Sequence, residues 1–125
     1  MFVRKFAKVI MALVIIGSLV SVGHALSKED VYYGKPRRFK KAAEVNAKKV
    51  FMAIPAYREI IDKNIEKDSA RYVMKLEEAN KVFHEAISRY AEENEYDLVC
   101  EEGRLEGAHN ATDEVVEIIK ADTGQ

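Results

Sequence analysis

The sequence predicts an α+β fold, in which a helical hairpin arm stands on a small β-sheet body that a C-terminal helix closes. Residues 55–95 contain no glycine, and no proline after the first position, and their apolar side chains recur at helical spacing. Residues 96–100 then change to a period of two, with Tyr96, Leu98 and Cys100 on one side and Asp97 and Val99 on the other, which is typical of a strand. The helical pattern returns after residue 112. These three observations predict one small domain over residues 42–122.

Residues 1–25 have the composition of a signal peptide. Three basic residues lie within the first eight positions, and the apolar stretch Val9–Val22 follows. That stretch is short for a membrane span, which needs about 20 residues. We expect cleavage after Ala25 and a periplasmic location. An uncleaved segment that tethers the protein is the alternative.

Residues 26–41 are polar and basic, and Gly34 and Pro36 interrupt any regular element. This composition predicts a flexible N-terminal arm outside the domain. The next residues are ambiguous between helix and strand. Ala43, Val45 and Ala47 alternate with polar residues, which favours a short strand.

Pro55 suits the first turn of a helix, because its missing N–H would have no partner there. A continuous helix over 55–95 would span about 60 Å, which is long for a domain with a gyration radius of about 13 Å. The apolar pattern lapses over residues 66–69, where Asp68 or Ser69 can cap a second helix. The sequence therefore indicates a hairpin with a short first arm and a longer second one, although periodicity alone also allows one unbroken helix.

After the arm, residues 96–100 predict a strand that pairs near residues 43–47. Residues 101–103 predict a turn, and residues 104–108 a possible return strand. Asn110 or Thr112 then caps the last amphipathic helix.

Charge is unevenly distributed along the chain. Removing residues 1–25 leaves 17 basic and 21 acidic residues of the original 20 and 21, a net charge of about −4. Residues 28–49 carry an excess of basic side chains and residues 92–122 an excess of acidic ones. This division of charge has two interpretations: the basic residues near the N-terminal end of the domain attract an anionic partner, or both charged regions are simply solvated surface.

Residues able to carry chemistry are few. Cys100 is the only cysteine, so it cannot form an internal disulfide. We expect Cys100 to fill space in the core on the same side as Tyr96 and Leu98, with an intermolecular disulfide or a reactive thiol as alternatives. His84 and Glu85 match half of a zinc-protease motif, but position 88 is a serine. We predict no catalytic, cofactor-binding or metal-binding residues and no enzyme activity.

Three segments resemble the Skp/OmpH family of periplasmic chaperones. AEVNAKKVFMAIPAYREI is similar to the first strand and helix entry of that family, and FHEAISRYAEENEYDLVCEEG to its returning helix and strand. NATDEVVEIIK resembles its closing helix. The segments occur in the family order and cover about 80 residues of the chain.

The resemblance implies a homotrimer whose strands form a compact body from which helical hairpins project. It further implies ATP-independent holding of unfolded outer-membrane proteins, without a cofactor or nucleic acid. Membrane contact would be peripheral or through an uncleaved signal, and no client-binding residue can be transferred because the client surface of the family is diffuse. The arm is shorter than that of the family and the mature chain is acidic, so an envelope structural or interaction protein that oligomerises through its arm is the alternative. A redox or ligand-binding module centred on Cys100 is a third hypothesis.

Overall fold

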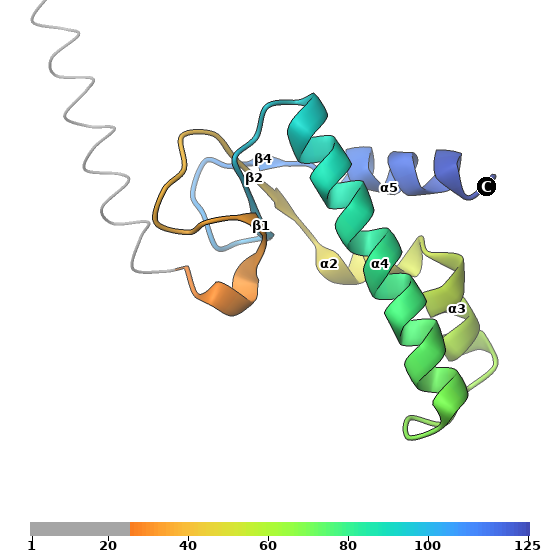
Figure 1. The fold of residues 1–125 in the computed structure, drawn as a ribbon. Coiled ribbons are helices and arrows are strands. Elements are labelled where there is room, and N and C mark those ends of the chain that lie inside the picture. Colours follow the sequence, from red (N-terminus) through yellow and green to blue (C-terminus); the bar gives the residue numbers. More distant parts are fainter. Residues whose placement is uncertain (1–25) are drawn as a thin grey trace, which may run out of the picture.

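The computed structural model describes residues 26–125, which form four α-helices and a four-stranded mixed sheet (Figure 1). In chain order the elements are the 3₁₀ helix η1 (Lys28–Asp30), β1 (Val31–Gly34), β2 (Ala42–Val45), α2 (Ala47–Met52), α3 (Pro55–Asp62), α4 (Ala70–Glu93), β3 (Leu98–Glu101), β4 (His109–Asn110) and α5 (Thr112–Asp122). The predicted α+β class is therefore confirmed. The predicted signal peptide lies outside the described residues.

The sheet has the strand order β1-β3-β2-β4. Strands β2 and β3 are parallel, and Ala43 lies opposite Val99, so the predicted pairing of these two segments is confirmed. Strand β4 is parallel to β2 on the other side, whereas β1 is antiparallel to β3. The chain between β2 and β3 forms the three helices α2, α3 and α4, and β2 and β3 are neighbours in the sheet. The helical hairpin is therefore an insertion between two adjacent strands.

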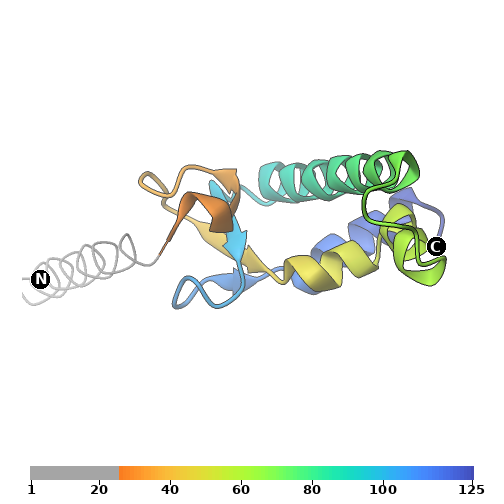
Figure 2. The ribbon, with the colours of Figure 1, turned by 90° about the horizontal axis from the view of Figure 1, so that it is seen from below.

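Residues 55–93 form a hairpin and not one continuous helix. Helix α3 has Pro55 in its first turn, and α4 begins after Ser69, whose side-chain oxygen accepts a hydrogen bond from the backbone N–H of Tyr72 at 3.2 Å. The two helices lie side by side, and their turn is at the end of the molecule opposite the sheet (Figures 1 and 2). The interruption predicted over residues 66–69 thus separates a short helix from a long one.

Two sequence-based predictions about the strands are wrong. Residues 26–41 do not form an arm outside the domain, because Val31–Gly34 is an edge strand of the sheet. Residues 104–108 do not form a return strand; they belong to a loop, and the chain next pairs at His109–Asn110, with β2 and not with β3.

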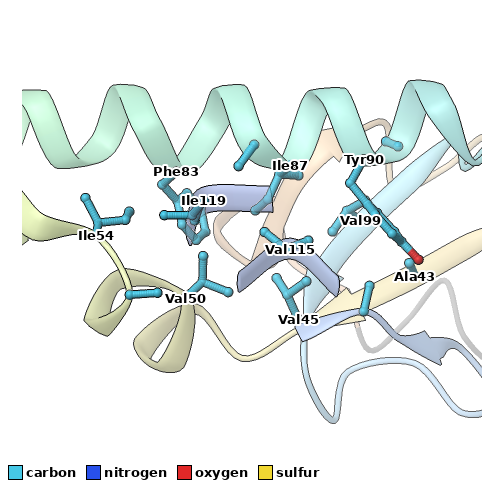
Figure 3. Close-up of a cluster of buried hydrophobic side chains, with 14 of the residues drawn as sticks. Ala43, Val45, Val50, Ile54, Phe83, Ile87, Tyr90, Val99, Val115 and Ile119 are labelled. Atoms are coloured by element: carbon cyan, nitrogen blue, oxygen red, sulfur yellow. The ribbon is translucent and has the colours of Figure 1, made fainter. Parts of the chain in front are cut away.

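One face of the sheet packs on the helices and holds the main core. Ala43 and Val45 of β2 and Val99 of β3 lie under α4 and α5 (Figure 3). The helices contribute fully or almost fully buried side chains at helical spacing: Phe83, Ile87, Tyr90, Val115 and Ile119. This main core joins the sheet to α4 and α5. The part of α4 nearest the sheet therefore belongs to the body of the domain.

The opposite face of the sheet has a smaller core, over which the described part of the chain places loops and no α-helix. Leu98, Cys100 and Leu105 are buried there, and loop residues such as Phe39 pack against them. Cys100 therefore faces the same side as Leu98, as predicted. Tyr96 does not share that side: it precedes β3 and packs against the main core.

Candidate functional site

Within residues 26–125, three of the four exposed large apolar side chains lie in the outer part of the α3–α4 hairpin, which we call the hairpin tip; the fourth is Met52 of α2. Ile61 on α3 is 48% exposed, and Val73 and Met74 on α4 are 49% and 70% exposed. The buried stripe of α4 runs through Ala79, Phe83 and Ile87, so neither Val73 nor Met74 contributes to it. The hairpin tip therefore presents large apolar side chains for which residues 26–125 provide no cover.

An ion-pair network holds the two helices together beside these side chains. One Glu59 carboxylate oxygen lies 2.8 Å from Lys63 Nζ and 3.2 Å from an Arg71 guanidinium nitrogen, and the other lies 2.7 Å from Lys75 Nζ. Hydrogen bonds from Lys63 and then Lys75 lower the pKa of Glu59 from its ordinary 4.5 to about 2. The network thus bridges α3 to α4 in addition to their apolar contact.

We expect the Glu59→Gln substitution to loosen the hairpin and to flatten the acid dependence of its stability. A carboxyl whose pKa is lowered in the folded state stabilises that state above its unfolded pKa and loses the effect as pH falls toward the folded value. The wild type should therefore lose this contribution between about pH 4.5 and pH 2, and the variant should lack it throughout. Amide hydrogen exchange of α3 against pH measures the effect.

Glu77→Gln is the matched control, because Glu77 is exposed on α4 and forms no ion pair within residues 26–125. An equal change in both variants would show that the Glu59 network does not stabilise the hairpin.

The side chains that could act as catalytic or metal-binding groups do not lie together in the structure. His84 and Glu85 are exposed on α4 and line a surface depression with Ser88 and Arg89. His109 lies on the edge strand β4. Within residues 26–125, no group of three histidine, cysteine or acidic side chains is placed to hold a metal ion.

Cys100 is fully buried, and its Sγ lies 3.8 Å from the carbonyl oxygen of Ala43. Burial, followed by the negative charge of Glu44, raises the pKa of the thiol to about 11. Since the thiolate is the reactive form, this thiol is a poor nucleophile at neutral pH. The predicted role of Cys100 as a buried apolar filler is confirmed.

Sequence reasoning missed a cluster of side chains from four segments that meet beside β4. The rings of Tyr90, Tyr96 and His109 stack in sequence, with centroid separations of 5.7 Å and 6.2 Å. Glu114 of α5 closes the stack, because its carboxylate bonds to the Tyr90 hydroxyl and lies 2.7 Å from His109 Nε2. Hydrogen bonding from Tyr90 holds the pKa of Glu114 below its ordinary value. The cluster attaches the short edge strand β4 to α4 and α5.

No family model, curated protein or solved structure in the comparisons matches this chain. No helix between residues 26 and 125 combines the length and the apolar character needed to cross a bilayer.

Proposed function

We propose that the protein is an exported, ATP-independent holdase that binds unfolded outer-membrane proteins through its hairpin tip. The exposed apolar side chains Ile61, Val73 and Met74 are the observation that carries the proposal. Unfolded chains expose apolar segments, and burying such surface against the hairpin tip would give reversible attachment without a catalytic group. The ordered resemblance of three segments to periplasmic chaperones supports the same function.

The hairpin tip combines exposed apolar groups with charge. Ile61, Val73 and Met74 lie on the same helices as the Glu59 network. Met74 is the most exposed of the three, and methionine adapts its shape to different partners because its side chain is unbranched and flexible. A surface of this kind suits clients that share apolar character and no particular sequence.

The test is whether the protein, at near-stoichiometric amounts, prevents aggregation of an unfolded outer-membrane β-barrel protein diluted from urea. We expect suppression by the wild type. The triple variant Ile61→Ser, Val73→Ser and Met74→Ser should bind at least about tenfold more weakly, because a fully buried large apolar side chain contributes roughly 1.5–3 kcal/mol. Light scattering from the diluted client measures the effect, and urea unfolding of each variant shows whether it remains folded.

Lys67→Ser, Glu77→Ser and Asn80→Ser together form the matched control, since these three side chains are exposed on the same turn and helix but are polar. A wild type that gives no suppression, or a control that fails as severely as the apolar variant, would exclude holding by the hairpin tip.

The second candidate is a structural or interaction protein of the envelope that oligomerises through its arm. The shortness of the arm favours it, since α3 has 8 residues and α4 has 24, which leaves little depth for enclosing a client. In that case the hairpin tip would lie between copies of the chain.

The mass in solution separates the two candidates. A trimer that persists in the apolar triple variant would support a body-mediated trimer with free hairpin tips, as the chaperone architecture implies. Dissociation of the oligomer by the same triple variant would support association through the arm.

A further inference from the structure

The two methionines of residues 26–125 both lie on the surface. Met74, near the start of α4, is 70% exposed, and Met52, at the end of α2, is 41% exposed. Neither the main core nor the smaller core of these residues contains a methionine. The described part of the chain therefore exposes its thioether sulfurs and does not use them to fill the interior.

Cys100, which carries the other sulfur in these residues, is protected from oxidants. Its side chain is fully buried, and burial raises the pKa of its thiol to about 11. The thiolate, which is the form that oxidants attack, is therefore scarce at neutral pH. An oxidant that meets the folded domain reaches a methionine before Cys100, and Met74 is the more exposed of the two methionines.

Met74 takes no part in the contacts that hold the hairpin together. The buried stripe of α4 does not include it. Its neighbours along the helix, Arg71 and Lys75, pair with Glu59 of α3 at 3.2 Å and 2.7 Å and so link the two helices. A chemical change at the Met74 sulfur therefore alters the surface of the hairpin tip and leaves these contacts in place.

We propose that Met74 is a reversible oxidation site that lowers the affinity of the hairpin tip for its clients, an inference that rests on the proposed function. The oxidant is hydrogen peroxide. The thioether sulfur attacks one peroxide oxygen, so that an S–O bond forms as the O–O bond breaks, and the leaving hydroxide takes the proton of the transferred hydroxyl. The sulfur is oxidised by two electrons to the sulfoxide, and the peroxide is reduced to water.

Oxidation changes the most exposed apolar side chain of the hairpin tip into a polar one. The sulfoxide oxygen accepts hydrogen bonds from water, so its burial against an apolar client segment is disfavoured. Ile61 and Val73, each about half exposed, remain apolar. Client affinity should therefore fall by roughly threefold to tenfold and should not vanish.

The exposure of Met74 also allows the change to be reversed. Methionine sulfoxide reductases, one for each epimer of the sulfoxide, must take the side chain into their own active sites. The hairpin tip lies at the end of the molecule away from the sheet (Figures 1 and 2). With a side chain that is 70% exposed there, a reductase reaches the sulfoxide without unfolding of the domain.

The test treats the full chain with hydrogen peroxide, removes the excess with catalase and follows each methionine by peptide mass spectrometry. We expect Met74 to be oxidised faster than Met52. The treated wild type should bind an unfolded outer-membrane β-barrel protein roughly threefold to tenfold more weakly than the untreated protein. The two reductases with dithiothreitol should restore binding, and urea unfolding should be unchanged throughout.

Met74→Leu keeps an apolar side chain but has no sulfur to oxidise, so it should hold the client equally well before and after peroxide. Met52→Leu is the matched control and should respond to peroxide as the wild type does. The inference is overturned if treated Met74→Leu loses as much binding as the treated wild type, or if Met52 is oxidised first. It is also overturned if the wild type, oxidised at Met74, binds the client as tightly as before.

Retention on an apolar chromatography resin gives a second measurement that does not involve a client. Peroxide should reduce the retention of the wild type and leave that of Met74→Leu unchanged. Absence of client binding by every untreated protein would overturn the holdase proposal. Unchanged retention of the wild type after oxidation of Met74 would overturn the present inference alone, so the two proposals can fail separately.

Discussion

Replacing Phe83 by alanine is expected to lower the free energy of unfolding by about 3–5 kcal/mol. Phe83 is 2% exposed and lies at the junction of three elements. Its ring stacks on Phe51 of α2 at a centroid distance of 4.4 Å and lies nearly perpendicular to the ring of Tyr32 of β1, at a centroid distance of 5.1 Å. The substitution therefore leaves a cavity between α4, α2 and β1 in a domain whose total stability is on the order of 5–15 kcal/mol.

Urea unfolding followed by circular dichroism measures this loss. Val73→Ala is the control on the same helix, because Val73 is 49% exposed and should change stability by less than about 0.5 kcal/mol. Phe83→Leu should lie between the two, since it retains most of the apolar volume. A loss below about 1 kcal/mol for Phe83→Ala would mean that the neighbouring side chains fill the cavity and that the packing of the core does not depend on this ring.

The Gly34→Ala substitution is expected to destabilise the fold by about 3 kcal/mol or more. Gly34 has a φ of +84°, and a Cβ atom there would lie 2.0 Å from the carbonyl oxygen of Asp97. That oxygen belongs to the backbone immediately before β3, which pairs with β1 at Gly34 and Leu98. The added methyl group would force β1 away from β3 or displace the segment around Asp97.

Gly103→Ala separates the two causes of this loss. Gly103 has nearly the same φ, +83°, but a Cβ atom there would meet nothing within 4 Å. This control should lose only the conformational cost, about 1–2 kcal/mol. Thermal unfolding of both variants tests the comparison, and equal losses would mean that the close approach to Asp97 is relieved at no cost.

Residue patterns predict the parts of the fold that depend on local sequence. The cap at Ser69 and the lapse of apolar residues before it locate the turn of the hairpin, because both signals lie within a few residues of that turn. The pairing of β2 with β3 is also predictable, since residues 42–45 alternate and residues 98–100 form a short apolar run between a helix and a turn.

The sequence analysis did not predict strand β1, because the contacts that make this segment a strand are with residues far along the chain. Val31–Gly34 is short, and it is a strand because β3 offers a free edge and because the Tyr32 hydroxyl donates to Glu101 at 2.8 Å. The same Glu101 oxygen accepts from the backbone N–H of Ala47 at 3.0 Å. No pattern within residues 26–41 contains this information, since the partners lie far along the chain.

The candidate site was only partly predictable. Ile61 and Val73 belong to the apolar pattern of residues 55–95, and the pattern alone assigns them to a buried stripe. They are exposed because α3 ends at Asp62 and residues 26–125 place no other helix over this part of α4. Periodicity gives the direction of a side chain around its helix, whereas exposure depends on what packs beside that helix.

The hairpin arm is inserted between the adjacent strands β2 and β3, so its length can change independently of the sheet. The chain leaves one strand and re-enters the neighbouring one, so whole helical turns can be inserted near residues 62–70 without changing the strand register. Phe83 and the residues after it would keep their places over the sheet. Related proteins could therefore carry arms of different reach on the same body, and an engineer could lengthen or shorten the arm by adding or deleting matched turns in α3 and α4.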